Sequence, residues 1–137
     1  DLPTLPFQIV IADLDIAFSA DRVRDYYDAL EGPRQLIVLD NAGHNSFTDA
    51  CGPIWDLGGL ASIGEALGLP ANLLELGENG CVPDAGFTEP AEFLKLLNHL
   101  TLAHLLDVFE IEDVGDALTS TLDTEFAGLV ESNDIAG

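Results

Sequence analysis

Two apolar runs separated by one helical segment constrain the fold of this chain more than any other feature. Residues 7–13, FQIVIAD, form a continuous apolar run, and residues 34–39, RQLIVL, form a second. Such runs are typical of strands that are buried on both faces of a parallel sheet. Between them, residues 19–32 carry apolar side chains at helical spacing, with Ser19 as the predicted N-cap. A strand, a helix and a strand form a βαβ unit, which predicts neighbouring parallel strands joined by a right-handed crossover.

The rest of the chain divides into a loop-rich stretch and a helical end. Residues 51–87 contain short helical patterns that glycines interrupt. From Thr88, a predicted cap with Pro90 in the first turn, the longest helix is expected over residues 89–111. Its apolar residues cover most of its circumference, so it is expected to be buried on more than one side. A further helix is predicted around Thr124 to Glu131.

These elements predict an α/β fold in a single domain. Residues 1–50 form the βαβ unit, residues 51–87 form the loop-rich excursion, and residues 88–137 add C-terminal helices to the same domain. Two parallel strands do not make a stable sheet alone, because parallel sheets occur with several strands and with helices on both faces. The sheet is therefore expected to be completed by a missing N-terminal segment.

The charge balance excludes several kinds of partner. The chain has 25 acidic and four basic residues, and its formal net charge is −21. Nucleic acids and anionic membranes need a basic surface that four side chains cannot supply. No stretch of the sequence is long and apolar enough to span a membrane. Because 47% of the residues are hydrophobic, the acidic residues are expected to lie on the surface of a folded domain. An acidic surface with one lysine resembles proteins of salt-loving organisms, although an ordinary acidic secreted protein is the alternative.

The two cysteines are predicted to form a disulfide. Cys51 and Cys81 both lie in loop-like sequence, without the additional Cys or His ligands of a metal site and without a C-x-x-C motif. A bond between them would close a loop poor in regular structure. It would also favour a secreted or extracytoplasmic location. Two buried thiols are the alternative.

An aspartate and a histidine follow the two predicted strands at the same end of the sheet. Asp13 and Asp15 follow the first strand, and His44 lies five residues beyond Leu39 at the end of the second. Ligands of open α/β sheets bind outside the carboxyl ends of the strands. Because adjacent strands lie about 4.8 Å apart, loops at equivalent positions can bring an aspartate to a histidine. A carboxylate that orients an imidazole makes it a general base.

Residues 7–47 resemble the last part of the α/β-hydrolase fold. In that family a strand ending in Gly-x-x-Asp delivers the acid of a Ser-His-Asp triad, and this motif matches residues 12–15 with Ala12 in place of glycine. The resemblance makes Asp15 the acid, with Asp13 as its competitor. The family's Gly-His step is present at residues 43–44, followed by Asn-Ser-Phe as in esterase-like and dienelactone-hydrolase-like members. The segment from Cys51 to Cys81 and the long helix look similar to bacterial enzymes related to platelet-activating-factor acetylhydrolase.

The nucleophile of such a triad is not found in this chain. The sequence contains no Gly-x-Ser-x-Gly, and in the resembled fold this motif lies N-terminal to the acid and the histidine. Ser46 is too close to His44 to be the nucleophile and is expected to pack or to cap a helix. Ser19, Ser62 and Ser120 lack the strand-turn-helix setting.

The other residues that carry potential chemistry have plain structural interpretations. His99 and His104 are five residues apart on the long helix, not at the spacing of four that a zinc helix uses. Trp55 is expected to anchor a loop, with a pocket wall as the alternative. The acidic stretches at residues 110–116 and 131–134 do not match the calcium loop of an EF-hand. No cofactor or metal is predicted.

Two functions are compatible with these features. The leading hypothesis is the C-terminal segment or subunit of a secreted serine hydrolase that acts on a small carboxylic ester or lipid-like substrate. Asp15 and His44 would supply the acid and the base, and an N-terminal hydrolase segment would be the partner that carries the serine. The alternative is a non-catalytic acidic scaffold or binding subunit derived from the same fold.

Overall fold

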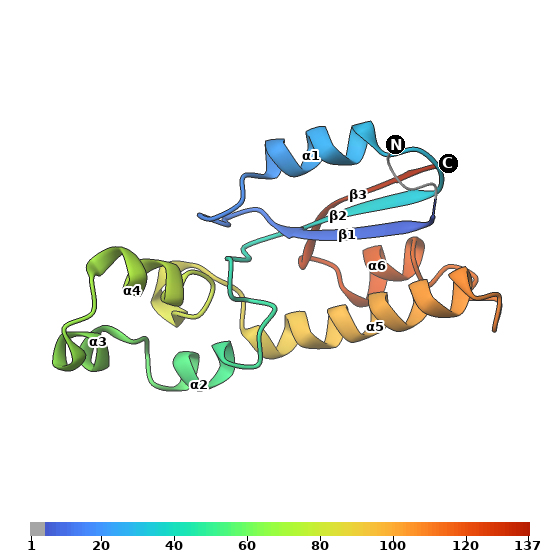
Figure 1. The fold of residues 1–137 in the computed structure, drawn as a ribbon. Helices are drawn as coiled ribbons and strands as arrows, with labels where there is room; N and C mark the ends of the chain where they lie inside the picture. Colours follow the sequence, from blue (N-terminus) through green and yellow to red (C-terminus); the bar gives the residue numbers. More distant parts are fainter. Residues whose placement is uncertain (1–4) are drawn as a thin grey trace.

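A computed structural model of the protein describes residues 5–137, apart from the side chain of Ser62. The described chain contains a small sheet and short helices around one long helix (Figure 1). In chain order the elements are β1 (Phe7–Ala12), α1 (Ala20–Ala29), β2 (Arg34–Leu39), α2 (Cys51–Asp56), α3 (Ala61–Leu67), α4 (Ala71–Glu78), the 3₁₀ turn η1 (Pro83–Ala85), α5 (Pro90–Val108), α6 (Ser120–Glu125) and β3 (Val130–Ala136).

The sheet has three strands in the order β1-β2-β3. Strands β1 and β2 pair in parallel, in a register that runs from Phe7 opposite Arg34 to Ala12 opposite Leu39. The predicted parallel pairing is therefore confirmed. Helix α1 connects the two strands, and the side chain of Ser19 accepts a hydrogen bond from the backbone N–H of Arg22, as an N-cap does.

The third strand corrects the prediction of a helix at residues 124–131. Helix α6 ends at Glu125, and after a turn that contains Gly128 at φ +83° the chain enters β3. Strand β3 pairs antiparallel with β2, from Arg34 opposite Ala136 to Leu39 opposite Val130. The open edge of β2 thus supplies hydrogen-bond partners that a local sequence pattern does not reveal. The sheet is mixed, not a pair of parallel strands.

Helices cover both faces of the sheet (Figure 1). Helix α1 lies on one face, while α5 and α6 lie on the other. The central strand β2 is buried on both faces, as predicted, and its residues 35–39 are all buried. Strand β1 is half-buried except at Ala12, which corrects the expectation that it is buried on both faces. The physical reason is that β1 is the edge strand of the described sheet.

The main core lies between the sheet and α5. It contains eight buried residues: Ala12, Ile37, Leu39, Ala42, Phe93, Leu96, Leu100 and Leu122. The long helix begins at Pro90, without a side-chain cap, and the N–H of Thr88 donates to the carbonyl of Asn41 instead. On α5, Leu102 and Leu105 are exposed, so within the described residues this helix is buried on one side, contrary to expectation.

The excursion between β2 and α5 is more regular than the sequence predicted. Three short helices, α2, α3 and α4, extend beyond the ends of the strands and return to α5 (Figure 1). Residues 79–81, just after α4, pack back against the loop that follows β2. This return brings the excursion to the carboxyl end of the sheet.

Candidate active site

The loops that follow β1 and β2 are tied together at the carboxyl end of the sheet. The N–H of Asp13 donates to the carbonyl of Leu39 at 3.1 Å, and the N–H of Leu14 donates to the carbonyl of Ala42 at 3.0 Å. These bonds continue the parallel pairing by one step beyond the strands. They place the loop after β1, residues 13–19, beside the loop after β2, residues 40–50. We call these the acid loop and the histidine loop, after Asp15 and His44.

The structure brings Asp15 and His44 into contact. Nδ1 of His44 lies 3.0 Å from Oδ2 of Asp15. The side chain of His44 is 28% exposed and that of Asp15 is 10% exposed, so the pair is partly shielded from water. The ring of Phe18 lies 5.6 Å from that of His44, between ring centroids, and shields it further. The sequence predicted this contact correctly, while the catalytic role of the pair stays a prediction.

The acid loop holds the carboxylate of Asp15 in a fixed orientation. Oδ1 accepts hydrogen bonds from the backbone N–H of Ala17 at 2.6 Å and from that of Phe18 at 2.9 Å. The other oxygen, Oδ2, faces Nδ1 of His44. A carboxylate that accepts the Nδ1 proton selects the neutral tautomer in which Nε2 is an acceptor. Nε2 forms no hydrogen bond with the part of the chain that the structure describes, and the side chain is partly exposed.

Asp13, the competing acid, has a different partner. Its Oδ1 accepts a hydrogen bond from the N–H of Ala42 at 2.9 Å. This bond joins the loop after β1 to the start of the loop after β2, 29 residues further along the chain. Asp13 therefore supports the loop, and Asp15 is the aspartate that contacts the imidazole.

Gly43, just before the histidine, allows a close approach of two backbones. A Cβ at this position would lie 2.6 Å from the carbonyl carbon of Asn79 and from Cα of Gly80. Real Cβ atoms do not approach backbone atoms so closely, so any side chain would separate the two segments. The close packing against residues 79–80 therefore requires glycine directly before His44.

Ser46 is built into the interior next to that contact. Its side chain is fully buried, and Oγ accepts from the N–H of Gly43 at 2.9 Å and donates to the carbonyl of Gly80 at 3.3 Å. A hydroxyl with both partners satisfied inside the protein is a packing group. The expectation that Ser46 is not the nucleophile agrees with this position.

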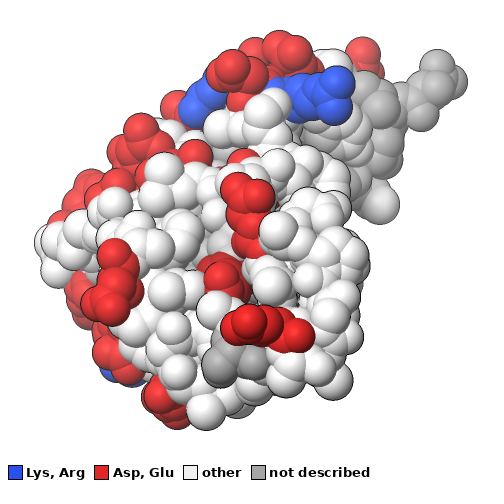
Figure 2. All heavy atoms as spheres, turned by 90° about the vertical axis from the view of Figure 1, so that its left-hand side faces the viewer, with Lys and Arg blue, Asp and Glu red and all other residues white. Residues whose placement is uncertain are grey.

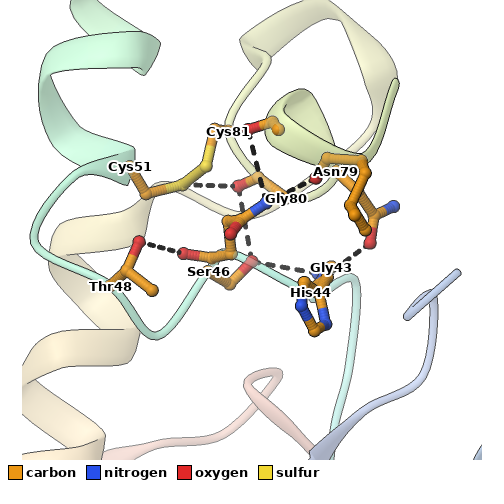
Figure 3. The surroundings of a disulfide bond; sticks show 11 residues. Gly43, His44, Ser46, Thr48, Cys51, Asn79, Gly80 and Cys81 are labelled. Carbon is orange, nitrogen blue, oxygen red and sulfur yellow. Dashed lines mark hydrogen bonds between the residues drawn. A yellow bond between two sulfur atoms is a disulfide. The ribbon is translucent and has the colours of Figure 1, made fainter. Parts of the chain in front are cut away.

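The predicted disulfide is present between Cys51 and Cys81 (Figure 3). Both cysteines are fully buried, and Sγ of Cys51 lies 3.1 Å from the carbonyl oxygen of Gly80. Gly80 adopts φ +94°, a conformation that favours glycine. The disulfide therefore fastens residues 79–81 to the start of α2, just beyond the histidine loop. A disulfide is compatible with an extracellular location.

Asn79 is the residue of this site that the sequence analysis missed. Its amide lies between the acid loop and the histidine loop and bonds to both, accepting from the N–H of His44 at 2.5 Å and donating to the carbonyl of Leu14 at 3.1 Å. The residue carries no motif of its own. The proximity of Cys81 is the one sequence signal that points toward this segment.

The two other histidines lie apart from the pair, on α5. Nε2 of His99 is 2.7 Å from the carbonyl oxygen of Ala117, and the ring packs against Phe126. His104 lines a cavity at the opposite end of the sheet, and burial lowers its pKa below the ordinary 6.5. Trp55 lies in α2, half-buried. The structure thus gives His99 a packing role.

Three cavities of the described chain lie away from the Asp15–His44 pair. The first, of about 390 Å³, opens at the amino ends of β1 and β2. The second lies along β3 and α6, and the third lies beside α5. Among residues 5–137, no group of three or more His, Cys, Asp or Glu side chains could hold a metal ion. Within the same residues, no helix is long and apolar enough to cross a membrane.

Acidic side chains are scattered over the face of the molecule that carries α3 and α4, at the carboxyl end of the sheet. Figure 2 shows red carboxylates across much of this face, while blue basic groups gather at the top, over α1. Arg24 of α1 forms an ion pair with Asp134 of β3 at 2.7 Å, and this hydrogen bond raises the pKa of the guanidinium. Arg34 lies on β2, while Lys95 lies on α5 and pairs with Glu92 at 2.5 Å. The excursion, residues 51–87, contains acidic residues and no lysine or arginine.

Comparisons of the chain with models of protein families, with curated proteins and with solved structures found no match. The interpretation of the site therefore depends on its geometry.

Proposed function

We propose that this chain is the C-terminal segment or subunit of a serine hydrolase and supplies the acid and the base of a Ser-His-Asp triad. The observation that carries the proposal is the 3.0 Å contact between Asp15 and His44 at the carboxyl ends of adjacent parallel strands. An N-terminal segment of the same fold carries the serine and the oxyanion donors in this proposal.

The proposed reaction is acyl transfer to water. The serine hydroxyl adds to the ester carbonyl carbon while Nε2 of His44 takes its proton, and Asp15 stabilises the imidazolium. When the tetrahedral intermediate collapses, the alcohol leaves with that proton and an acyl-serine remains. Water then adds to the acyl-serine in the same way, which releases the carboxylic acid and restores the serine.

The surroundings of the pair support a carboxylic-ester or lipid-like substrate. Leu14, Ile16 and Phe18 of the acid loop are 42%, 53% and 65% exposed. Exposed apolar side chains next to a general base favour an apolar acyl or alkyl group over a charged one. The net charge of −21 also disfavours anionic substrates.

The edge of the sheet supports pairing with the N-terminal segment. Strand β1 has one strand neighbour among the described residues, and its side chains 7–11 are only half-buried. An unpaired strand edge is a template for another strand. We propose that a parallel strand of the N-terminal segment pairs with β1 and brings the serine toward Nε2 of His44.

Location and habitat are part of the same proposal. The buried disulfide supports a secreted enzyme, because such bonds persist in oxidising compartments. The ratio of 25 acidic to four basic residues supports a protein adapted to high salt.

A fluorophosphonate probe and short p-nitrophenyl esters test the function in the complete native protein. The expected result is hydrolysis, with covalent labelling of a serine outside residues 1–137. The His44→Ala variant should lose ester hydrolysis and covalent labelling while its circular dichroism spectrum stays the same. A native protein that neither reacts nor hydrolyses the esters would overturn the enzymatic proposal.

Co-expression tests the dependence on the N-terminal segment. Residues 1–137 expressed alone should aggregate or remain molten and show no esterase activity, because β1 and the exposed face of α5 lack their partners. Co-expression with the N-terminal segment should restore folding and turnover. A monodisperse, cooperatively melting monomer of these residues alone would contradict the proposed partner.

One observation favours the second candidate function, a non-catalytic binding subunit. The cavity of about 390 Å³ is lined by Arg34, His104 and Asp107 among apolar residues. Nε of Arg34 is buried and has no hydrogen-bond partner among the described residues. The His44→Ala variant separates the two functions, because in a non-catalytic binding subunit this substitution would not change labelling or turnover of the complete native protein.

A further inference from the structure

We infer that Asn79 is a positioning residue that sets the geometry of the Asp15–His44 pair, an inference that rests on the proposed function. The Asn79 residue is 8% exposed and lies between the two loops. Its Oδ1 accepts from the N–H of His44 at 2.5 Å and from the N–H of Ile16 at 3.4 Å, and its Nδ2 donates to the carbonyl of Leu14 at 3.1 Å. One amide therefore holds the backbone on both sides of Asp15 and the backbone of His44.

The chemistry of these contacts requires a side-chain amide. Two N–H groups face Oδ1 and one carbonyl faces Nδ2, so the site needs an acceptor and a donor on the same short side chain. An apolar residue would leave three backbone groups without their partner, at about 1–3 kcal/mol for each group that stays buried. An aspartate would keep the acceptor but place a second oxygen against the carbonyl of Leu14.

The backbone of Asn79 is itself held in place by contacts of residues 79–81 with neighbouring segments. Its backbone carbonyl accepts from the N–H of Asn45 at 2.9 Å, next to the histidine. Gly80 packs against Ser46, and Cys81 is bonded to Cys51 (Figure 3). The segment is thus fastened on the side of the histidine loop, and the amide transmits that position to the acid loop.

Loss of the amide should therefore displace Asp15 relative to His44 without removing either group. The side-chain amide of Asn79 forms its hydrogen bonds with backbone groups of the two loops and not with the side chains of Asp15 or His44. A misplacement of about 1 Å lowers a catalytic rate by about 10²-fold. The Asn79→Ala variant should lower kcat to that extent and leave KM for a short ester unchanged.

The kinetic experiment uses the complete native protein, with kcat normalised to the serines titrated by a fluorophosphonate. Asn79→Ala should lose about 10²-fold in kcat. Asn79→Asp, which buries a carboxylate oxygen against the carbonyl of Leu14, should lower kcat as well. The matched control is Asn133→Ala, because Asn133 bonds to Gln35 and to the carbonyl of Leu118 at another part of the sheet. This control should lower the melting temperature and leave kcat per titrated site unchanged. An unchanged kcat in Asn79→Ala, or an equal loss in Asn133→Ala, would overturn the inference.

A second measurement does not depend on turnover. In ¹⁵N-histidine-labelled native protein, the Nδ1–H of His44 should give a downfield proton resonance, assigned by its absence in His44→Ala. The resonance should broaden or disappear in Asn79→Ala and persist in Asn133→Ala. If it persists in Asn79→Ala, the positioning role is wrong. If the native protein shows no turnover and no labelling while the resonance behaves as expected, the proposed function fails and the positioning role stands.

Discussion

The carboxylate of Asp15 divides its two oxygens between the backbone and the imidazole. Oδ1 is held by two N–H groups of its own loop, and Oδ2 is left for Nδ1 of His44. The neighbouring Asp13 instead bonds to the N–H of Ala42. Two aspartates that are two residues apart thus have different hydrogen-bond partners.

This difference predicts opposite outcomes for two isosteric substitutions. Asp15→Asn presents an amide to His44 and no longer selects the reactive tautomer, so kcat should fall by about 10⁴-fold. Asp13→Asn keeps an oxygen that accepts from Ala42, so turnover should be retained. The measurement is p-nitrophenyl ester hydrolysis by the complete native protein. Equal effects of the two substitutions would contradict the assignment of Asp15 as the acid.

Gly43 and Gly52 provide a second matched pair of residues. A Cβ on Gly43 would meet the backbone of residues 79–80, whereas a Cβ on Gly52, within α2, would meet no atom within 4 Å outside its chain neighbours and its own helix. Gly43→Ala should lower the free energy of unfolding by about 1–3 kcal/mol through overpacking. Gly52→Ala should cost less than Gly43→Ala, because the following Pro53 disfavours a helical conformation for a residue with a Cβ but no distant backbone is in the way. Urea unfolding of the oxidised native protein measures both, and a neutral Gly43→Ala would argue against the close packing.

At the scale of elements, the excursion of α2, α3 and α4 is held to the sheet through residues 79–81. The disulfide joins the start of α2 to the segment just after α4, and α2 also contacts α5. The disulfide therefore joins the two ends of the excursion next to its contact with the histidine loop. Its attachment determines how firmly the candidate site is supported.

Removal of the disulfide should destabilise the protein substantially. For a loop of this size the chain-entropy model gives about 3–4 kcal/mol. The Cys51→Ser/Cys81→Ser variant should show this loss in urea unfolding, and a reducing agent should reproduce it in the wild-type protein. In the variant, the reducing agent should have no effect. Two free thiols in protein that was never exposed to reductant would contradict the bond itself.

His104 on α5 should make the protein less stable in acid. Burial lowers its pKa below 6.5 in the folded state, so as the pH falls the unfolded chain takes up the proton first. This contribution to stability is complete above pH ~6.5 and is lost as the pH falls from there through the lowered pKa. His104→Gln should reduce the difference in unfolding free energy between pH 8 and pH 5. Leu105→Gln, at an exposed neighbouring position, should leave that difference unchanged.

At the scale of the whole molecule, repulsion between carboxylates opposes folding. A net charge of −21 is carried by 137 residues, and acidic groups are distributed over the face shown in Figure 2. Like charges repel over about 10 Å at 0.1 M salt and over about 3 Å at 1 M. Salt therefore weakens a repulsion that arises from the carboxylates of the whole surface and not from one residue.

The melting temperature should rise between low and molar KCl. A gain of ~1 kcal/mol corresponds to a rise of about 4 °C for a domain of this size. The triple variant Glu112→Gln, Glu125→Gln and Glu131→Gln neutralises three exposed acids and should show a smaller rise. A flat profile in the wild-type protein would contradict the proposed adaptation to high salt.

The sequence by itself determined the parallel pair of strands, the contact at their ends and the disulfide. Continuous apolar runs separated by an amphipathic helix have few compatible arrangements, and parallel strands place Asp15 and His44 at the same edge. The cysteines could be paired because neither had other ligands nearby. These features depend on short stretches of sequence, so local chemistry was sufficient.

Only the tertiary structure decided β3, the burial of β1 and α5, and the role of Asn79. Residues 130–136, VESNDIA, are rich in side chains that are depleted in strands, and they form β3 where β2 offers an open edge. The Asn79 amide bonds to Leu14, which is 65 positions away in the chain. No local pattern carries such information, because the partners of a polar side chain or a strand edge are fixed only when distant segments pack together.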